Sequence, residues 1–356
     1  MTNSSSHTTA ADAKTSPAKT PSVKAPGLDI VIVTWNAGRQ IHACLEALAA
    51  SRWSGLTLDK VILSDNDSRD GSLAALPDSD LPLVVLQNGE NLGFGRACNR
   101  GAAAGQAELL LFLNPDTRVA PDAVAAAVAE LMKPENDAVG VLGAQLLNDD
   151  GTVARCCARL PRAGNFWSMI FGLHRLFPQR AAGMLMTDWD HADSRDVDHV
   201  MGAFYLVRRS LFQALGGFDD RFFLYLEDLD FSNQMAAAGW RSRYFAAAKV
   251  HHASGGISAQ IPARRLFLSL QSRLLYSFKH FSPLAAWGVL AGTCLLEPWP
   301  RLTLALTRGS LKEAGFCLAA FGQLYASLPR TLATARRYGR GSSAAEAPQP
   351  AGSARR

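Results

Sequence analysis

Three carboxylates stand within four positions of one another in the second half of the chain. Glu227, Asp228 and Asp230 belong to the segment DDRFFLYLEDLDFSNQMAAAGW, between aromatic residues and an apolar stretch of helical character. Such a group is a candidate for general-base chemistry, because a positioned carboxylate can take a proton from a reacting hydroxyl. The simpler interpretation is that these acids are exposed on a helix or cap its first turn, where acidic side chains are favoured.

Two further acids follow apolar runs that are typical of buried strands. Asp65 ends LDKVILSD, and Asp116 ends AELLLFLNPD. Each can be read as the cap of a following helix. If the two strands are parallel, however, their carboxyl ends meet at one edge of a sheet, where ligands bind in such folds. The acids together therefore favour a site over two unrelated caps.

The segment GENLGFGRACNRG adds polar groups around a predicted helix start. Asn91 and Asn99 flank this start, which offers backbone N–H groups to an anion, although Asn91 can also be the N-cap. Gly93 and Gly95 lack the third glycine of a dinucleotide-binding motif, and the segment follows the third predicted strand rather than the first. A dinucleotide site is therefore not predicted here.

The elements that must position these residues alternate along the chain. We expect strands over 28–36, 58–67, 81–88, 107–116 and 138–147, helices over 37–51, 93–105 and 120–133, and a short helix after Gly71. A strand and a helix are expected within 196–217, and two short strands within 240–256. This alternation predicts an α/β fold with a mostly parallel central sheet flanked by helices.

The charge is unevenly distributed. Residues 28–258 carry a net −7 and residues 259–356 a net +10. Residues 1–27 have no apolar run, so they predict a disordered tail and no secretory signal; residues 336–356 predict a second disordered tail. The six cysteines show no C-x-x-C pair or zinc-like spacing, which favours buried thiols and a reduced, cytoplasmic setting.

Residues 259–335 predict a helical, membrane-associating region. The ranges 281–296 and 314–329 each run 16 residues without a charge, whereas a spanning helix needs about 20. With Trp287, Trp299 and the basic residues nearby, we expect helices that lie on an anionic membrane surface. A two-helix hairpin in the membrane and an ordinary soluble helical subdomain are the alternatives. Nucleic-acid binding is not expected, because the sequence offers no aromatic and basic platform.

Taken in order, several motifs resemble those of a known family. They are DIVIVTWN, SDNDSRDGS, NLGFGRACNRG, LFLNPDT, MGAFYLVRRSLFQALGGFDDRFFLYLEDLDFSNQMAAAGW and VHHASGG. Together they resemble the inverting nucleotide-sugar glycosyltransferases of glycosyltransferase family 2, in particular the rhamnosyltransferase-like branch. The resemblance covers residues 28–258 and implies the Rossmann-like GT-A fold.

The resemblance implies roles for individual residues. Asp228, with Glu227 beside it, would be the base that takes the acceptor proton. Asp116 would be the main ligand of a divalent cation, Mg²⁺ or Mn²⁺, although Asn114 stands where relatives have a second carboxylate. His251 would lie near this cation, with His252 as the alternative.

The remaining implied roles concern the nucleotide-sugar donor. The residues expected to bind it are Thr34, Asn36, Asp65, Asn91, Gly93, Asn99 and Asn114. Asp65 would accept a hydrogen bond from a uracil or thymine base, and Thr34 and Asn36 would line the same pocket.

The resemblance implies a metal-dependent hexosyltransferase of bacterial cell-surface polysaccharide synthesis. It would move rhamnose from dTDP-rhamnose, with inversion, to a glycan or polyprenyl-linked acceptor at the inner face of the cell membrane. The alternatives are transfer of another hexose from a UDP-sugar, or a catalytically inactive scaffold of a polysaccharide assembly complex.

Overall fold

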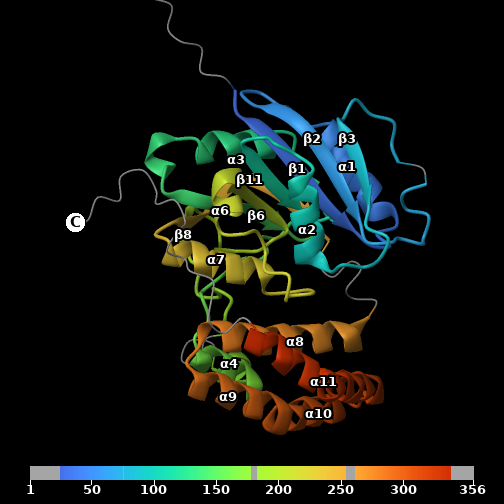
Figure 1. Cartoon of the computed structure of the whole chain (residues 1–356), viewed down its shortest axis with the longest axis vertical. Helices are drawn as coiled ribbons and strands as arrows, with labels where there is room; N and C mark the ends of the chain where they lie inside the picture. The colour runs from blue at the N-terminus through green and yellow to red at the C-terminus, as the bar shows by residue number, and fades with distance from the viewer. Residues whose placement is uncertain (1–24, 75, 178–182, 254–260, 338–356) are drawn as a thin grey trace, which may run out of the picture.

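The computed structural model describes residues 25–74, 76–177, 183–253 and 261–337. The two predicted tails fall almost wholly outside these ranges. Two layers make up the described part of the chain (Figure 1). A mixed α/β unit occupies the upper half of the view, and a layer of helices lies beneath it.

One nine-stranded sheet forms the centre of the upper unit, with strand order β3-β2-β1-β4-β10-β6-β11-β5 and β8 paired to β11. Its strands are β1 (Gly27–Thr34), β2 (Thr57–Asp65), β3 (Leu83–Gln87), β4 (Leu109–Leu113), β5 (Thr117–Val119), β6 (Val139–Leu147), β8 (Arg195–Val197), β10 (Phe204–Arg208) and β11 (Arg241–His252). β1, β2, β3, β4, β6 and β11 run in one direction, and β5, β8 and β10 run against them. The predicted α/β fold with a mostly parallel sheet is confirmed.

The apolar runs of the sequence form the middle of this sheet. All five residues of β4 are buried, as are the last seven of β1, because helices cover both faces of the sheet and leave no face for water. The flanking helices are α1 (Arg39–Ala49), α2 (Phe94–Ala103), α3 (Ala123–Leu131), α6 (Arg209–Ala214) and α7 (Glu227–Ala237). Five of the six cysteines are buried and none forms a disulfide.

Six helices form the lower layer: α4 (Ala163–Ile170), α5 (Leu173–Leu176), α8 (Pro262–His280), α9 (Pro283–Ala291), α10 (Pro298–Thr307) and α11 (Leu311–Arg337). A five-residue π-helix, η3 (Gly292–Leu296), joins α9 to α10. This layer has its own hydrophobic core, built around Phe166, Leu274, Tyr276 and Phe321. Within the described ranges, no helix is both long and apolar enough to cross a bilayer.

Two local expectations differ from the structure. Residues 71–74 form a turn rather than the start of a helix. The two short strands predicted within 240–256 are one strand, β11, whose register with β6 shifts between Phe245 and Lys249. Pro329 lies inside α11 and does not end it. Two short strands outside the main sheet, β7 (Cys157–Ala158) and β9 (His199–Val200), pair with each other beneath its edge.

Candidate active site

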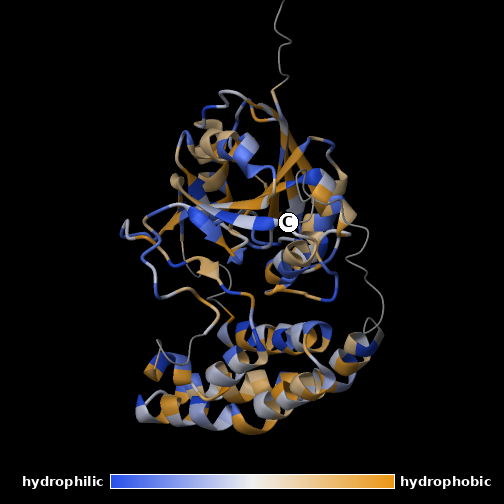
Figure 2. Cartoon of the chain, turned by 90° about the vertical axis from the view of Figure 1, so that its left-hand side faces the viewer, coloured by the Kyte–Doolittle hydropathy of each residue, from blue (hydrophilic) through white to orange (hydrophobic). Residues whose placement is uncertain are grey.

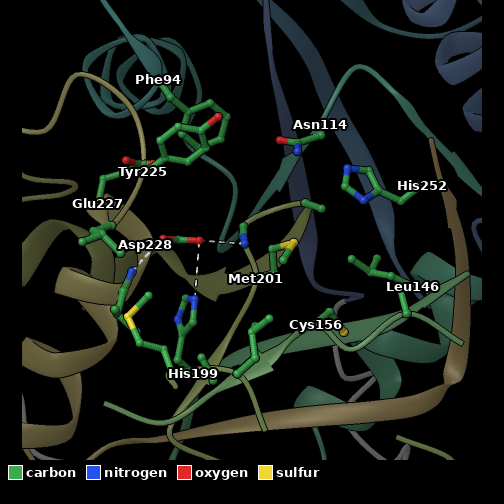
Figure 3. A pocket seen from close by; sticks show the side chains of 18 of the residues that line it. Phe94, Asn114, Leu146, Cys156, His199, Met201, Tyr225, Glu227, Asp228 and His252 are labelled. Carbon is green, nitrogen blue, oxygen red and sulfur yellow. Dashed lines mark hydrogen bonds and ion pairs between the residues drawn. The ribbon is translucent and has the colours of Figure 1, made fainter. Parts of the chain in front are cut away.

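Two adjoining cavities lie between the sheet and the helical layer. The larger, which we call the central cavity, has a volume of about 450 Å³ (Figure 3). The smaller, the strand-end cavity, has a volume of about 220 Å³ and extends toward Val33, Trp35 and Asn66. The two share a group of lining residues: Phe94, Asn114, Asp116, Leu224 and Tyr225. A two-part ligand can therefore lie across both.

A strained turn brings α7 to the central cavity. Tyr225 and Leu226 both have left-handed backbone, with φ of 71° and 67°. This region costs a side chain other than glycine on the order of 1 kcal/mol or more. The turn directly precedes Glu227 and Asp228, the first residues of the helix, and Tyr225 lines both cavities. Strain of this kind concentrates at functional sites, where surrounding contacts hold it in place.

The backbone fixes the carboxylate of Asp228 at the wall of the central cavity. Its Oδ2 atom accepts a 2.8 Å hydrogen bond from the Gly202 N–H, and its Oδ1 atom accepts one of 2.8 Å from the Leu229 N–H. A Cβ atom on Gly202 would stand 2.9 Å from Oδ2, so only glycine lets the backbone approach this closely. The side chain keeps 16% of its surface exposed, which leaves it accessible to a substrate hydroxyl.

Glu227 differs from its neighbour in its surroundings. It is buried, and its Oε2 atom finds no hydrogen-bond partner among the described residues. Burial, reinforced by the charge of Asp228, raises the pKa of Glu227 well above its ordinary value of 4.5. The protonated, neutral form of Glu227 is therefore favoured.

Asp230 has a role that its sequence position does not reveal. From the sequence, a helix N-terminal charge is the natural interpretation, yet Asp230 is fully buried. Its carboxylate contacts Lys279 Nζ at 2.7 Å and His280 Nε2 at 2.6 Å, both on α8. Lys279 also contacts Asp219 at 2.6 Å. These contacts fasten α7 to the helical layer.

Asp116 and His252 form a polar pair on the opposite side of the cavity from Asp228. His252 Nε2 lies 3.3 Å from Asp116 Oδ1, and this oxygen is buried without a hydrogen bond from any described residue. Asn114 lines both cavities beside them. His252 faces the cavity (Figure 3), and His251, which the sequence favoured, is not among the lining residues. Neighbouring residues of a strand point to opposite faces, so the two histidines cannot share one role.

The pair fits a divalent cation that a substrate helps to bind. Among the described residues, no three His, Cys, Asp or Glu side chains gather as a metal site. Asp116 nevertheless offers a buried oxygen without a partner, and His252 offers an imidazole nitrogen. A cation held here would take its remaining ligands from a bound anion or from water.

The ends of β1 and β2 bring three predicted donor-binding residues together. Thr34 and Asp65 are direct partners in the parallel register, and both are buried. Both oxygens of Asp65 lie 3.2 Å from the Ser68 N–H. Asn36 accepts a hydrogen bond from the Arg69 N–H. The buried hydroxyl of Thr34 has no hydrogen-bond partner among the described residues, and Thr34, Asn36 and Asp65 are not among the lining residues of either cavity.

The loop before α2 is fastened to the loop before α7. Gly93 has a φ of 82°, and a Cβ atom there would stand 2.3 Å from the Phe223 carbonyl oxygen. The Phe94 N–H donates to that oxygen at 2.8 Å, and Asn91 accepts from the Gly93 N–H at 3.0 Å. Asn91 and Gly93 line the strand-end cavity.

Asn99 lies elsewhere on α2. Its amide donates to the Phe218 carbonyl at 2.7 Å and accepts from the Phe218 N–H at 2.9 Å. It is not among the lining residues of either cavity, so these contacts give it a structural role. Its predicted part in donor binding stays a prediction.

One functional candidate was missed from the sequence. His199, on β9, is buried beside the central cavity with its Nε2 atom 3.5 Å from Asp228 Oδ2 (Figure 3). In the sequence it is a single histidine within the expected strand segment DVDHVMGAFYL, and only its position three residues before Gly202 marks it.

Comparison with known proteins identifies relatives of this chain. The family model described as Glycosyl transferase family 2 matches residues 29–216, more than half of the chain. The N-acetylglucosaminyl-diphospho-decaprenol L-rhamnosyltransferase of Mycobacterium tuberculosis (strain ATCC 25618 / H37Rv) is 28% identical over 274 residues, which are 70% of this chain and 83% of that protein. The O-antigen biosynthesis protein RfbC of Myxococcus xanthus is 30% identical over 214 residues, 59% of this chain and 16% of that protein.

One solved structure can be superposed on most of this chain. The mannosyltransferase PcManGT from Pyrobaculum calidifontis, in complex with GDP-Man and Mn²⁺, is 21% identical, with 89% of this chain and 85% of that chain covered and a TM-score of 0.49.

Proposed function

Because the chain belongs to glycosyl transferase family 2 and is therefore a glycosyltransferase, we propose that Asp228 is the base of an inverting sugar transfer in cell-surface polysaccharide synthesis. The observation that carries this proposal is the accessible carboxylate of Asp228, held by two backbone N–H groups at the wall of the central cavity. The adjacent Glu227 is the less suitable base of the two, because it is buried and burial raises its pKa.

The proposed reaction displaces a nucleoside diphosphate. Asp228 takes the proton of an acceptor hydroxyl, while the oxygen of that hydroxyl forms a bond to the anomeric carbon of the donor sugar. The bond from that carbon to the phosphate oxygen breaks, and its electron pair leaves with the diphosphate. Attack from the face opposite the leaving group inverts the anomeric configuration. General-base assistance of this kind is worth about 10²–10⁴ in rate.

Asp116 and His252 are proposed to hold a divalent cation, Mg²⁺ or Mn²⁺, against the donor diphosphate. The partnerless oxygen of Asp116 supports this assignment. When bound, the cation would neutralise charge that develops on the leaving group. His252 replaces His251 in this proposal because it lines the central cavity beside Asp116.

The strand-end cavity is proposed to bind the nucleotide. Thr34, Asn36 and Asp65 lie at the ends of β1 and β2 near it, and Asn91 and Gly93 line it. A pyrimidine N3–H would donate to Asp65, and the diphosphate would extend toward Asn114 in the shared wall of the cavities. We propose dTDP-rhamnose as the donor; the name of the Mycobacterium relative, an L-rhamnosyltransferase, supports the sugar of this donor.

A lipid-linked acceptor at a membrane surface is supported by the outer side of the helical layer. Trp287 and Trp299 of this layer are 45% and 68% exposed, and its helices carry hydrophobic segments among polar ones (Figure 2). The other exposed large apolar residues of the described helices from α9 to α11 are Leu284, Leu295, Leu296, Leu304, Leu306, Leu311, Leu318 and Tyr325. Tryptophan prefers the headgroup region, and arginine and lysine are attracted to anionic lipid.

A third cavity, of about 660 Å³, lies inside this layer among α4, α5, α10 and α11. Phe171, Leu176 and Leu304 contribute apolar walls, and Arg175 and Arg308 are exposed at its rim. This combination fits a lipid with an anionic head. The aromatic stretch 166–177 contributes residues to this cavity and none to the central one.

A donor panel tests the proposal. Purified protein is incubated with dTDP-rhamnose and UDP-hexoses, with and without diphospholipid-linked N-acetylglucosamine, and release of nucleoside diphosphate is measured against an Asp228→Asn control. Acceptor-stimulated release from dTDP-rhamnose is expected. Preference for a UDP-hexose would correct the donor assignment alone. Donor binding without release under any condition would instead favour an inactive scaffold.

A further inference from the structure

A chain of buried polar groups stands behind the carboxylate of Asp228. His199 Nε2 is 3.5 Å from Asp228 Oδ2, and His199 Nδ1 is 2.9 Å from the Ser232 hydroxyl. That hydroxyl is 3.0 Å from the hydroxyl of Tyr205. His199, Ser232 and Tyr205 are all buried and come from β9, α7 and β10 respectively. A chain of groups from three separate elements thus ends at one oxygen of the proposed base, with His199 as the member next to that oxygen.

The hydrogens of this chain have one consistent arrangement. An ionised Asp228 accepts only, so His199 must turn a protonated Nε2 toward it. In a neutral imidazole, Nδ1 is then an acceptor, and Ser232 donates to it. The Ser232 oxygen can still accept from the Tyr205 hydroxyl, which lies 3.0 Å away and also stands 3.5 Å from the Asp228 carbonyl oxygen. In this arrangement His199 Nδ1, Ser232 and Tyr205 each have a hydrogen-bond partner, as buried polar groups require.

His199 is surrounded so that it stays neutral. Burial lowers the pKa of His199 even though Asp228 and Asp198 act in the opposite direction. The strands and helix around β9 carry the following titratable groups: Cys157 on β7, Tyr205 on β10, Glu227, Asp228 and Asp230 on α7, and Arg241, Arg243, Tyr244, Lys249, His251 and His252 on β11. Arg241 and Arg243 pair with Asp196, and Asp230 pairs with α8, so Asp228 is the charged group that meets the imidazole directly.

We propose that His199 is a positioning residue that presents a neutral N–H to Asp228, fixing the orientation of the carboxylate and favouring its ionised form. It acts through Asp228 and touches no reacting atom. The backbone N–H of Gly202 binds Oδ2 at 2.8 Å, and His199 Nε2 stands 3.5 Å from the same oxygen, close enough for its N–H to act on the carboxylate electrostatically. A hydrogen bond to the charged form of an acid stabilises that form. This inference rests on the proposed role of Asp228.

The test compares the pH dependence of kcat in four full-length variants. His199→Phe keeps a planar aromatic ring but removes the hydrogen-bond donor. We therefore expect kcat to fall on the order of 10- to 100-fold with an unchanged KM for the nucleotide-sugar. A carboxylate that has lost a hydrogen-bond donor is protonated more readily. The fall of kcat on the acidic side of the pH profile, which we call the acidic limb, is therefore expected to move to higher pH by about one unit. His199→Gln, whose amide can replace the Nε2–H, restores most of both effects.

Two further variants separate positioning from general damage. Ser232→Ala removes the group that sets the imidazole tautomer and is expected to move the acidic limb in the same direction but less. Ser232→Ala also tests the positioning role in case His199→Phe does not fold. His191→Phe removes another fully buried histidine, which stacks on Trp189 and bonds to the backbone of Trp189 and Cys157, and is expected to leave the acidic limb in place.

The outcomes distinguish this inference from the proposed function. If Asp228→Asn is inactive while the histidine and serine variants keep the wild-type acidic limb, His199 has no positioning role and the proposed function stands. The inference is also overturned if His199→Phe lowers kcat without moving the acidic limb and His199→Gln does not restore kcat. An active Asp228→Asn would overturn the proposed function itself.

Discussion

Lys279 of α8 and Asp230 of α7 form a buried ion pair that joins the helical layer to the helix of the proposed base. Their charged atoms are 2.7 Å apart, and the carboxylate has no exposed surface. Asp230 lies two residues after Asp228, on the same helical turn. The orientation of α7 is therefore set by both layers of the protein.

Replacing Lys279 with methionine should destabilise the protein strongly. The variant leaves Asp230 and Asp219 with less compensation for their charge, and breaking a buried pair costs about 3–5 kcal/mol. Urea unfolding measures the change. Arg52→Met, at the exposed Arg52–Asp122 pair, is the control and should show no measurable loss. Equal stability of both variants would mean that the α7–α8 contact contributes little.

Glu227 and Asp228 should respond differently to amide substitution. Asp228→Asn removes the proposed base and should lower turnover by at least about 10²-fold while donor binding persists. Glu227→Gln replaces a side chain whose neutral form is already favoured, so its loss should be far smaller. Initial rates and donor titrations on both variants measure this difference. If Glu227→Gln were as inactive as Asp228→Asn, the assignment of the base to Asp228 alone would be wrong.

The two histidines at the end of β11 should differ in their effect on metal dependence. Asp116→Ala and His252→Ala should each weaken Mn²⁺-dependent donor binding on the order of 10-fold or more, since each removes a proposed ligand. His251→Ala is the matched control because its side chain leaves the strand on the opposite face. Calorimetric titration of donor with and without Mn²⁺ tests this. A larger effect at His251 would restore the original sequence assignment, and donor binding that EDTA leaves intact would remove the cation from the proposal.

Membrane attachment should depend on the two exposed tryptophans. A Trp287→Ser/Trp299→Ser double variant should float less with anionic liposomes at low salt, because it loses interfacial aromatic contacts and keeps the basic residues. Val85→Ser, which changes an exposed apolar residue on the sheet, is the control. Should the wild type itself stay with the soluble fraction, a water-soluble acceptor becomes the better proposal.

The sequence predicted those parts of the site that follow from chain order. The acids at 65 and 116 could be placed at one sheet edge because parallel strands end together, and residues 30–33 and 109–113 were apolar enough to mark buried strands. His252 could not be chosen over His251, since the choice depends on which face of β11 meets Asp116, and the register with β6 shifts inside that strand. His199 was missed because it meets Asp228 only through tertiary contacts, across 29 positions of sequence. The same holds for Asp230 and Lys279.

The left-handed turn at Tyr225 and Leu226 has a consequence for evolution and engineering. Glycine at either position would relax the backbone and gain stability, as such exchanges do at positive φ. Yet Tyr225 forms part of both cavity walls, and Leu226 packs on the core of the helical layer. Selection of variants for stability alone would favour glycine at these positions and would remove side chains that line the substrate cavities. These two positions are therefore where a trade-off between robustness and activity is expected to be sharpest.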